Sequence, residues 1–180
     1  MKTFSNSIKK NKFLLIIILM LSGTCLYLYF KPNSELNINS KIDNIVVYKS
    51  KRQLLAYSNG KLLKTYKISL GKNPVGAKHH QGDNKTPEGV YSINGKNPKS
   101  IAYKNLGISY PNKVDVERAR KLGKPTGGDI KIHGMMNGLG FIGRLHICSD
   151  WTNGCIAVTD REIDELFKYV KTGAKIEIVP

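Results

Sequence analysis

The alternation of apolar and polar residues predicts a series of short β-strands between residues 45 and 110. Residues 45–50 (IVVYKS) form a β-branched run. Two more runs, QLLAYS and KLLKTYKISL, are separated by Asn59-Gly60, a dipeptide typical of tight β-hairpin turns. Residues 89–93 and 101–110 repeat the pattern. Residues 72–89 are instead interrupted by glycines and prolines, which predicts a long loop between strands.

Apolar residues recur at helical spacing nearer the C-terminus. Residues 114–123 have helical composition and end at a glycine. A second helix is predicted to begin after Thr159, because Thr159 and Glu162 have the form of a capping box. Its apolar positions are Ile163, Leu166, Phe167 and Val170. We expect Gly173 to end this helix and the following residues to form a last strand. The pattern therefore predicts a mainly β domain with one or two helices.

The first thirty residues follow a different pattern. Residues 1–12 are polar with four lysines, and residues 13–30 are 18 uncharged residues. This length is at the short end of what spans a bilayer, and the preceding lysines favour a cytoplasmic N-terminus. We therefore expect a cytoplasmic tail (1–12), a transmembrane anchor (13–30), a linker (31–42) and a domain (43–180) on the extracytoplasmic side, in the periplasm or wall. A cleaved signal peptide, or a lipoprotein signal ending at Cys25, is the alternative.

The charge of the chain restricts its partners. Twenty-nine Lys and Arg against 13 Asp and Glu give a net charge of +16, which favours anionic partners such as acidic wall polymers or anionic lipid. The lysines are spread over all segments and form no stripe interleaved with aromatic residues, so nucleic-acid binding is disfavoured. Three cysteines (25, 148 and 155) cannot all pair with one another, which argues against a disulfide scaffold.

Candidate chemistry gathers in residues 130–159. Cys155 follows Gly154, and two histidines, His133 and His146, lie upstream. A thiol beside a glycine turn, with an imidazole to accept its proton, is what nucleophilic acyl transfer requires. Pairing with imidazole is expected to raise the thiolate fraction. The amides of Gly154 and Cys155 are candidates to stabilise the oxyanion of a tetrahedral intermediate.

Two separated motifs resemble the L,D-transpeptidase (YkuD-type) catalytic domain. One is GDNKTPEG at residues 82–89, and the other is His133-Gly134 followed by TNGC at residues 152–155. The resemblance covers residues 43–180. The lead-in Asp150-Trp151-Thr152, together with Ala157, is most similar to the YafK-like branch, which acts in murein recycling. The resemblance implies a YkuD-like β-sandwich without cofactor or metal, with Cys155 as nucleophile and His133 as base.

The substrate implied by the resemblance is the peptidoglycan stem peptide. Cys155 would attack the carbonyl of the L-centre of a diamino acid bonded to D-alanine, forming a thioester and releasing D-alanine. An amine would then accept the acyl group, giving a crosslink or a wall-attached lipoprotein. Transfer to water would make the protein an L,D-specific murein amidase or carboxypeptidase. Asn153 and Ala157 stand where many members have histidine and arginine, so the choice between transferase and hydrolase stays open.

Further residues around the thiol are candidates to contact the substrate. They are Gly134, His146, Trp151, Thr152 and Asn153. Structural roles are the alternative, with His146 as a buried histidine, Thr152 bonded within the turn and Trp151 as a core ring. The segment Thr86–Gly89 is expected to be architectural. A zinc site from His133, His146, Cys148 and Cys155 does not fit the usual ligand spacing. A catalytically inert wall-binding module is the other rival hypothesis.

Overall fold

The structure is a computed structural model that describes residues 12–13, 15–24, 35–37, 39 and 41–180. The chain divides into two compact units, Met1–Glu35 and Leu36–Pro180. In the first unit residues 12–13 and 15–24 are helical and their large apolar side chains are exposed. No helix in the described part of the chain combines the length and the apolar character needed to cross a membrane. Positions 14 and 25–30 of the predicted anchor, including Cys25, lie outside the described residues, as do residues 1–11 of the predicted tail and 31–34, 38 and 40 of the predicted linker.

The second unit is built on one eight-stranded sheet with the strand order β3-β2-β1-β8-β4-β5-β6-β7. The strands are β1 (Ile42–Tyr48), β2 (Gln53–Ser58), β3 (Lys61–Lys67), β4 (Gly89–Ser100), β5 (Tyr103–Ile108), β6 (Lys131–His133), β7 (Ile156–Ala157) and β8 (Val170–Val179). The helices are α2 (Lys113–Lys121), α3 (Asp160–Tyr169) and the 3-10 helix η1 (Gly140–Cys148). The prediction of a mainly β domain with few helices is confirmed. The expected sandwich is instead one continuous, curled sheet.

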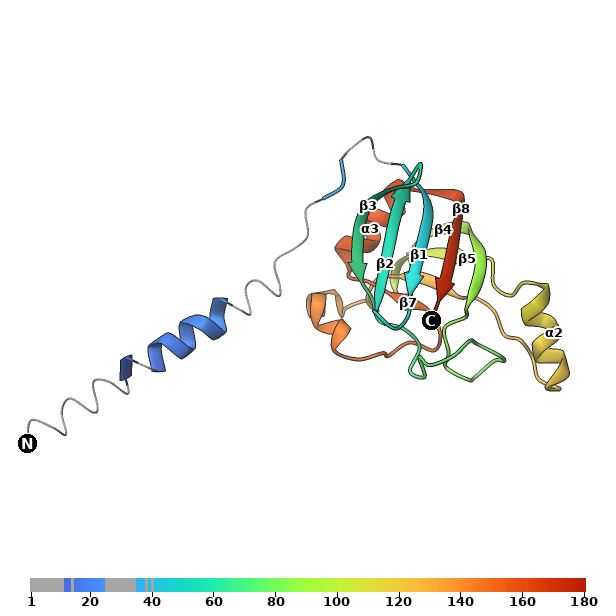
Figure 1. The fold of residues 1–180 in the computed structure, drawn as a ribbon, viewed down its shortest axis with the longest axis horizontal. Coiled ribbons are helices and arrows are strands. Elements are labelled where there is room, and N and C mark those ends of the chain that lie inside the picture. The colour runs from blue at the N-terminus through green and yellow to red at the C-terminus, as the bar shows by residue number, and fades with distance from the viewer. Residues whose placement is uncertain (1–11, 14, 25–34, 38, 40) are drawn as a thin grey trace, which may run out of the picture. The chain divides into compact units, whose positions relative to one another are not determined.

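The sheet curls because β4 pairs with a different neighbour along each half of its length. Gly89–Ser92 pairs with β8, whereas the residues from Ile93 onward pair with β5, and the register shifts just after Ile93. A strand that changes partner through an irregularity makes a corner in a sheet. Figure 1 shows β3, β2, β1 and β8 side by side at one end of this arrangement.

The two ends of the sheet meet just after β3. Ser69 pairs with Ala157 of β7, donating its amide to the Ala157 carbonyl at 3.0 Å and accepting the Ala157 amide at 2.8 Å. Gly71 forms a further isolated bridge with Thr152. We call this contact between residues 69–72 and residues 152–157 the seam. The seam places the predicted nucleophile turn against a strand from the opposite end of the sheet.

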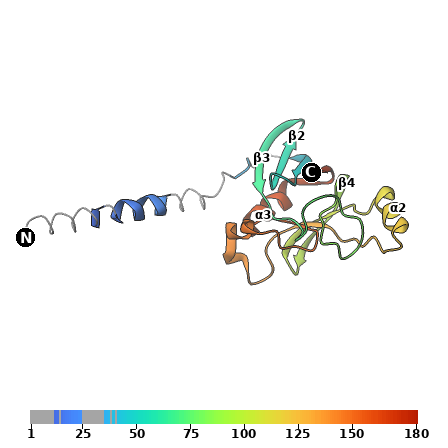
Figure 2. The same cartoon turned by 60° about the horizontal axis from the view of Figure 1, so that its bottom comes forward.

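Helix α3 lies within the curl and bonds to both halves of the sheet. Glu165 accepts hydrogen bonds from Lys64 (2.5 Å) and Tyr66 (3.0 Å), at the β3 end. Asp164 accepts from Tyr103 (3.1 Å) and Lys104 (2.6 Å) of β5. The two views place α2 and α3 on opposite sides of the domain (Figure 1, Figure 2). The apolar face of α3 closes the core, with Ile163 and Leu166 fully buried.

Two local signals in the sequence located element boundaries correctly, and a third did not. Asn59 (φ 47°) and Gly60 (φ 77°) turn the β2–β3 hairpin, as predicted. The predicted capping box forms at the start of α3, where the Glu162 amide donates to the Thr159 hydroxyl at 3.2 Å. The predicted end of this helix is wrong, because α3 ends at Tyr169 and Gly173 lies inside β8. Val170 is extended and pairs with Ile42 of β1, so strand pairing stops the helix.

The long loop after β3 is held by a buried lysine at the end of β1. Lys49 is 2% exposed, and its Nζ donates to the carbonyls of Gly76 (2.6 Å) and Thr86 (3.0 Å) and to the Glu88 carboxylate (2.8 Å). Thr86 in turn accepts a hydrogen bond from the Gly71 amide at 3.0 Å. These bonds fix the segment 82–89 directly against the seam, in agreement with an architectural role for Thr86–Gly89.

Candidate active site

The nucleophile turn, residues 151–155, is fixed to the seam by its backbone and by the preceding residue. The Thr152 amide donates to the Leu70 carbonyl at 3.1 Å, and the Lys72 amide donates to the Thr152 carbonyl at 3.0 Å. Asp150 accepts from the Leu70 amide at 2.9 Å and from Arg52 Nη2 at 2.6 Å. The turn is therefore held in place by residues 70–72 on the other side of the seam and by Arg52.

Thr152 also closes the turn internally. Its hydroxyl accepts the Gly154 amide at 3.1 Å and donates to the Cys155 carbonyl at 2.7 Å. Both capacities of the hydroxyl are thus used within the turn. Because the Gly154 amide is already bonded, the Cys155 amide is the remaining candidate of the two predicted oxyanion donors.

Gly154 packs directly against the backbone of the GDNKTPEG segment. Its φ is +131°, and a Cβ at this position would lie 2.7 Å from the carbonyl oxygen of Lys85. Only glycine combines this backbone conformation with such a close approach. The segment behind it is stiffened by Asp83, which accepts from the Lys85 amide (3.1 Å), the His79 amide (2.7 Å) and Lys78 Nζ (2.8 Å).

The pairing of β6 with β7 brings the histidine to the cysteine. The strands are parallel, with Ile132 opposite Ile156 and His133 opposite Ala157. Cys155 directly precedes β7 and bonds to the Lys131 amide, so it continues this register. Because side chains alternate along a strand, Cys155 and His133 lie on one face as diagonal neighbours, while Ile132 and Ile156 point into the core.

The hydrogen bonds of His133 leave one ring nitrogen free to act as a base. Nδ1 lies 2.6 Å from the Gly134 carbonyl oxygen, which only accepts, so Nδ1 carries the proton and Nε2 keeps its lone pair. The Trp151 ring packs edge-on against the imidazole, with ring centroids 5.6 Å apart. Burial lowers the pKa of His133 from its ordinary value, so the imidazole is neutral near neutral pH.

The thiol of Cys155 is half-buried and bonded to the backbone on both sides. Its Sγ donates to the Asp129 carbonyl at 3.7 Å and accepts from the Lys131 amide. Burial raises the pKa of Cys155, and the Lys131 amide, the Lys131 charge and the Lys78 charge oppose this only in part. In the resting site these shifts favour the thiol form of Cys155 and the neutral form of His133.

His146 lies in η1, close enough to His133 for the two rings to influence each other. It is 4% exposed, and its Nδ1 lies 3.0 Å from the Ser69 hydroxyl, which itself donates to the His146 carbonyl at 2.8 Å. Nδ1 therefore carries the proton. Burial, and secondarily the nearby His133, lowers the pKa of His146 to about 4. Its Nε2 is buried and has no hydrogen-bond partner among the described residues.

The other sequence candidates occupy different surroundings. Gly134 packs against α3, since a Cβ there would lie 2.6 Å from Asp160 Oδ1. Asn153 is exposed and accepts from Lys72 Nζ at 3.3 Å. Cys148 is exposed and is not in a disulfide. Within residues 41–180 and the other described positions, no three His, Cys, Asp or Glu side chains cluster as metal ligands would.

Sequence reasoning missed Lys131, which lies two residues before His133 on the same strand and therefore on the same face. The alternation of residues 130–133 was the available signal, but one lysine among many in a lysine-rich chain gives no sign of a special role. Its ammonium is 2.8 Å from the Asp129 carboxylate. Its positive charge lowers the pKa of His133 and opposes the rise at Cys155.

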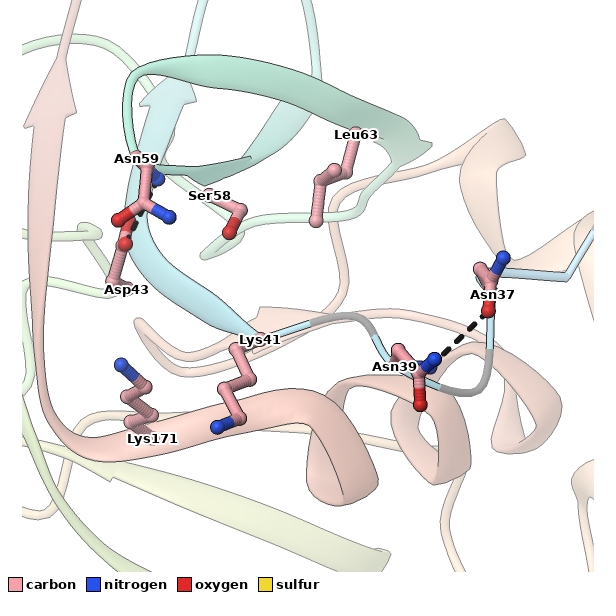
Figure 3. A pocket seen from close by; sticks show the side chains of 8 residues that line it. All are labelled: Asn37, Asn39, Lys41, Asp43, Ser58, Asn59, Leu63 and Lys171. Carbon is pink, nitrogen blue, oxygen red and sulfur yellow. Dashed lines mark hydrogen bonds between the residues drawn. The ribbon is translucent and has the colours of Figure 1, made fainter.

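A separate surface pocket of about 460 Å³ lies beside the β2–β3 hairpin turn. Figure 3 shows its lining, which comes from the segment before β1, from β1, from the β2–β3 hairpin and from the start of β8, and includes Lys41, Asp43, Asn59 and Lys171. None of the predicted catalytic or substrate-binding residues lines it. The candidate active site is therefore the face of β6 and β7 beside the seam.

Comparison with known proteins identifies the family of the domain. The family model of the YkuD L,D-transpeptidase catalytic domain matches residues 43–178. The protein named "Putative L,D-transpeptidase YafK" from Escherichia coli (strain K12) is 33% identical over 138 residues, which cover 73% of this chain and 48% of that protein. The chain thus matches about half the length of this curated relative.

Solved structures show the same fold. The helical cell shape determining protein Pgp2 from Campylobacter jejuni aligns with a TM-score of 0.58 at 26% identity, covering 85% of this chain and 53% of that one. Bd1075 from Bdellovibrio bacteriovorus aligns with a TM-score of 0.54 at 24% identity, covering 78% and 48% of the two chains. The family resemblance inferred from the two motifs is confirmed: the chain belongs to the YkuD family of L,D-transpeptidase catalytic domains.

Proposed function

We propose that this protein is a membrane-anchored cysteine L,D-transpeptidase that acts on peptidoglycan stem peptides through a thioester on Cys155. The observation that supports the proposal most is the parallel β6–β7 register, in which His133 is opposite Ala157, two residues after Cys155. Family membership, through residues 43–178, supports a peptidoglycan-modifying activity. The net charge of +16 suits a substrate rich in carboxylates.

In the acylation step His133 acts as general base. Its Nε2 takes the thiol proton while Sγ attacks the carbonyl carbon of the L-centre, and the carbonyl electrons move to oxygen. The Cys155 amide is the candidate donor to this oxyanion. When the intermediate collapses, the C–N bond breaks and His133 returns the proton to the amine of D-alanine. The product is a thioester and free D-alanine.

In the second step the same histidine activates the acceptor. Nε2 removes a proton from an amine, which attacks the thioester carbonyl, and the C–S bond breaks as Cys155 regains its proton. An amine from a neighbouring stem peptide gives a crosslink, and an amine from a lipoprotein gives a wall-attached protein. Water as acceptor gives hydrolysis. Ala157 favours this hydrolase alternative, because it is fully buried and offers no charged group to an acceptor.

We place the domain outside the cytoplasmic membrane, anchored through residues 13–30. The support is the run of 18 uncharged residues behind four lysines, and the exposed apolar side chains of Phe13 and of the helical residues 15–21. The likeness to a cell shape determining protein of Campylobacter jejuni supports a role in remodelling the wall. Fractionation tests the anchor: full-length protein stays with the membranes, whereas soluble protein with a new N-terminus near residue 25 would contradict it.

Digestion of muropeptides tests the reaction. Purified protein is incubated with muropeptides that carry tetrapeptide stems, and the products are read by mass. Dimers with a linkage between two diamino acids indicate transfer, and tripeptides without new crosslinks indicate hydrolysis. Cys155→Ala yields neither product. Sacculi that bind the wild type without any release of D-alanine would instead support an inert wall-binding module.

A further inference from the structure

Strand β6 carries two polar side chains on one face, and only one of them is the proposed general base. His133 and Lys131 alternate with buried Ile132, so both lie on the face that carries Cys155. In the parallel register, His133 is opposite Ala157, and Lys131 falls beside Cys155 itself. The thiol is therefore flanked by a base on one side and a lysine on the other.

The contacts around Lys131 tie it to the nucleophile. Its amide donates to Cys155 Sγ, and Sγ donates to the carbonyl of Asp129. The side chains of Lys131 and Asp129 form an ion pair at 2.8 Å, in which Lys131 is 30% and Asp129 is 80% exposed. An ion pair this exposed contributes little stability, so a substrate group can take the place of the Asp129 carboxylate.

We infer that the Lys131 ammonium binds the free α-carboxylate of the leaving amino acid of the acyl donor, displacing the carboxylate of Asp129. The inference rests on the proposed function, since it assigns the donor that Cys155 attacks. A carbonyl under attack lies within about 3.5 Å of the sulfur. The carboxylate of the leaving residue is one residue beyond that carbonyl, roughly 4 Å further along the chain. A lysine beside the thiol can reach it, and its charge matches.

This arrangement makes Lys131 a specificity residue. It favours donors that end one residue after the scissile bond, because only these place a free carboxylate beside the ammonium. Donors that continue past this residue, or that end in an amide, leave Lys131 paired with Asp129. The same charge also lowers the pKa of His133, so the effect on the substrate has to be separated from an effect on the base.

The test compares two peptides that differ only at this carboxylate. One is a stem tetrapeptide ending in D-alanine, and the other ends in D-alaninamide. Full-length protein in detergent is assayed for turnover, and the Cys155→Ala variant is assayed for binding by calorimetry. The free acid is expected to be favoured about 10- to 100-fold in kcat/KM and in Kd, the range of a charge-assisted hydrogen bond.

Substitutions assign the preference to Lys131. Lys131→Met abolishes the preference, because it weakens binding and turnover of the free acid and leaves those of the amide unchanged. Lys131→Arg restores part of the preference. Asp129→Asn lowers KM and Kd for the acid only, because the competing charge is gone; asparagine tolerates the positive φ of 60° at this position. The control is Lys175→Met, which breaks a similar exposed pair with Glu177 (2.9 Å) on β8 and leaves the preference unchanged.

The outcomes separate this inference from the proposed function. Equal binding of acid and amide by Cys155→Ala overturns the role of Lys131. An equal loss for both peptides in Lys131→Met, with a shifted pH–rate profile, also overturns it, because the lysine then acts only through His133 and Cys155. Acid-selective binding without any turnover in wild type leaves Lys131 as a carboxylate site and refutes the transpeptidase proposal. Circular dichroism verifies that each variant is folded.

Discussion

Replacing Gly154 with alanine tests how tightly the nucleophile turn packs on the segment behind it. The substitution has two costs. A non-glycine residue at a φ of +131° is strained by about 1–3 kcal/mol. In addition, the new Cβ would lie 2.7 Å from the Lys85 carbonyl oxygen, so the turn or the loop has to move, with an overpacking cost of about 1–3 kcal/mol. Together these predict a loss of about 2–6 kcal/mol in the free energy of unfolding.

Gly173 provides a matched control. It also has a positive φ (+87°), but nothing lies within 4 Å of a Cβ built there. Gly173→Ala therefore isolates the conformational cost, and the difference between the two variants, about 1–3 kcal/mol, measures the close approach. Urea unfolding of the two variants at pH 7 supplies these free energies.

Activity should separate the variants further. A displacement of the thiol by even 1 Å costs about 100-fold in rate, so Gly154→Ala is expected to lose turnover of stem peptides at a temperature where it is still folded. Gly173→Ala should keep the wild-type rate. If Gly154→Ala is no less stable than Gly173→Ala and retains full turnover, the packing of the turn against Lys85 is not what positions Cys155.

Three further predictions follow from the ionisable groups. Since burial lowers the pKa of His133 and raises that of Cys155, kcat/KM should rise with pH to a plateau, with the midpoint of the rise below the ordinary pKa of a histidine; a decline between pH 7 and 8 would show that an imidazolium is required. Iodoacetamide should modify exposed Cys148 before Cys155, as followed by peptide mass; faster modification of Cys155 would mean that its thiolate is favoured. Burial alone would raise the pKa of Asp83, but hydrogen bonds from Lys78 and from backbone amides lower it to about 2. The contribution of Asp83 to the stability of the folded protein is therefore complete above pH 4 and is lost as the pH falls toward 2. Asp83→Asn should thus lower the free energy of unfolding by about 2 kcal/mol at pH 7 and make it depend less on pH below pH 4. An unchanged dependence on pH in this range would exclude this role of Asp83.

The sequence located those elements whose signals are local. The Asn59-Gly60 turn demands positive φ at both residues and so marks the β2–β3 hairpin whatever surrounds it. The capping box of Thr159 and Glu162 is complete within four residues and likewise fixed the start of α3. The motif around Cys155 also lies within five residues, so the candidate nucleophile could be named before any contact was known.

Features set by distant partners could not be predicted in this way. Val170 continues the helical spacing of Leu166 and Phe167, but its pairing with Ile42 makes it the first residue of β8. Lys49 ends an ordinary strand pattern, yet it is 2% exposed because three acceptors from residues 76–88 surround its ammonium. In both cases the deciding contact lies more than 25 residues away in the chain.

The set of site residues predicted from the sequence was incomplete because it also depends on contacts between distant parts of the chain. That Lys131 adjoins Cys155 follows from the β6–β7 register, and two short strands separated by 22 residues do not reveal their register in the sequence. The use of the Thr152 hydroxyl within the turn, and the loss of the Gly154 amide as an oxyanion donor, likewise depend on hydrogen bonds that only the folded turn shows.

The central claim is that Cys155 carries the acyl group, and capture of the acyl-enzyme tests it most directly. Full-length protein is mixed with a stem tetrapeptide, quenched in acid within the first turnover, and digested for peptide mass analysis. We expect an adduct with the mass of the donor minus D-alanine on the peptide that contains Cys155, which is much slower to form in His133→Gln and absent in Cys155→Ala. Release of D-alanine with no adduct on Cys155, or release that persists in Cys155→Ala, would contradict it.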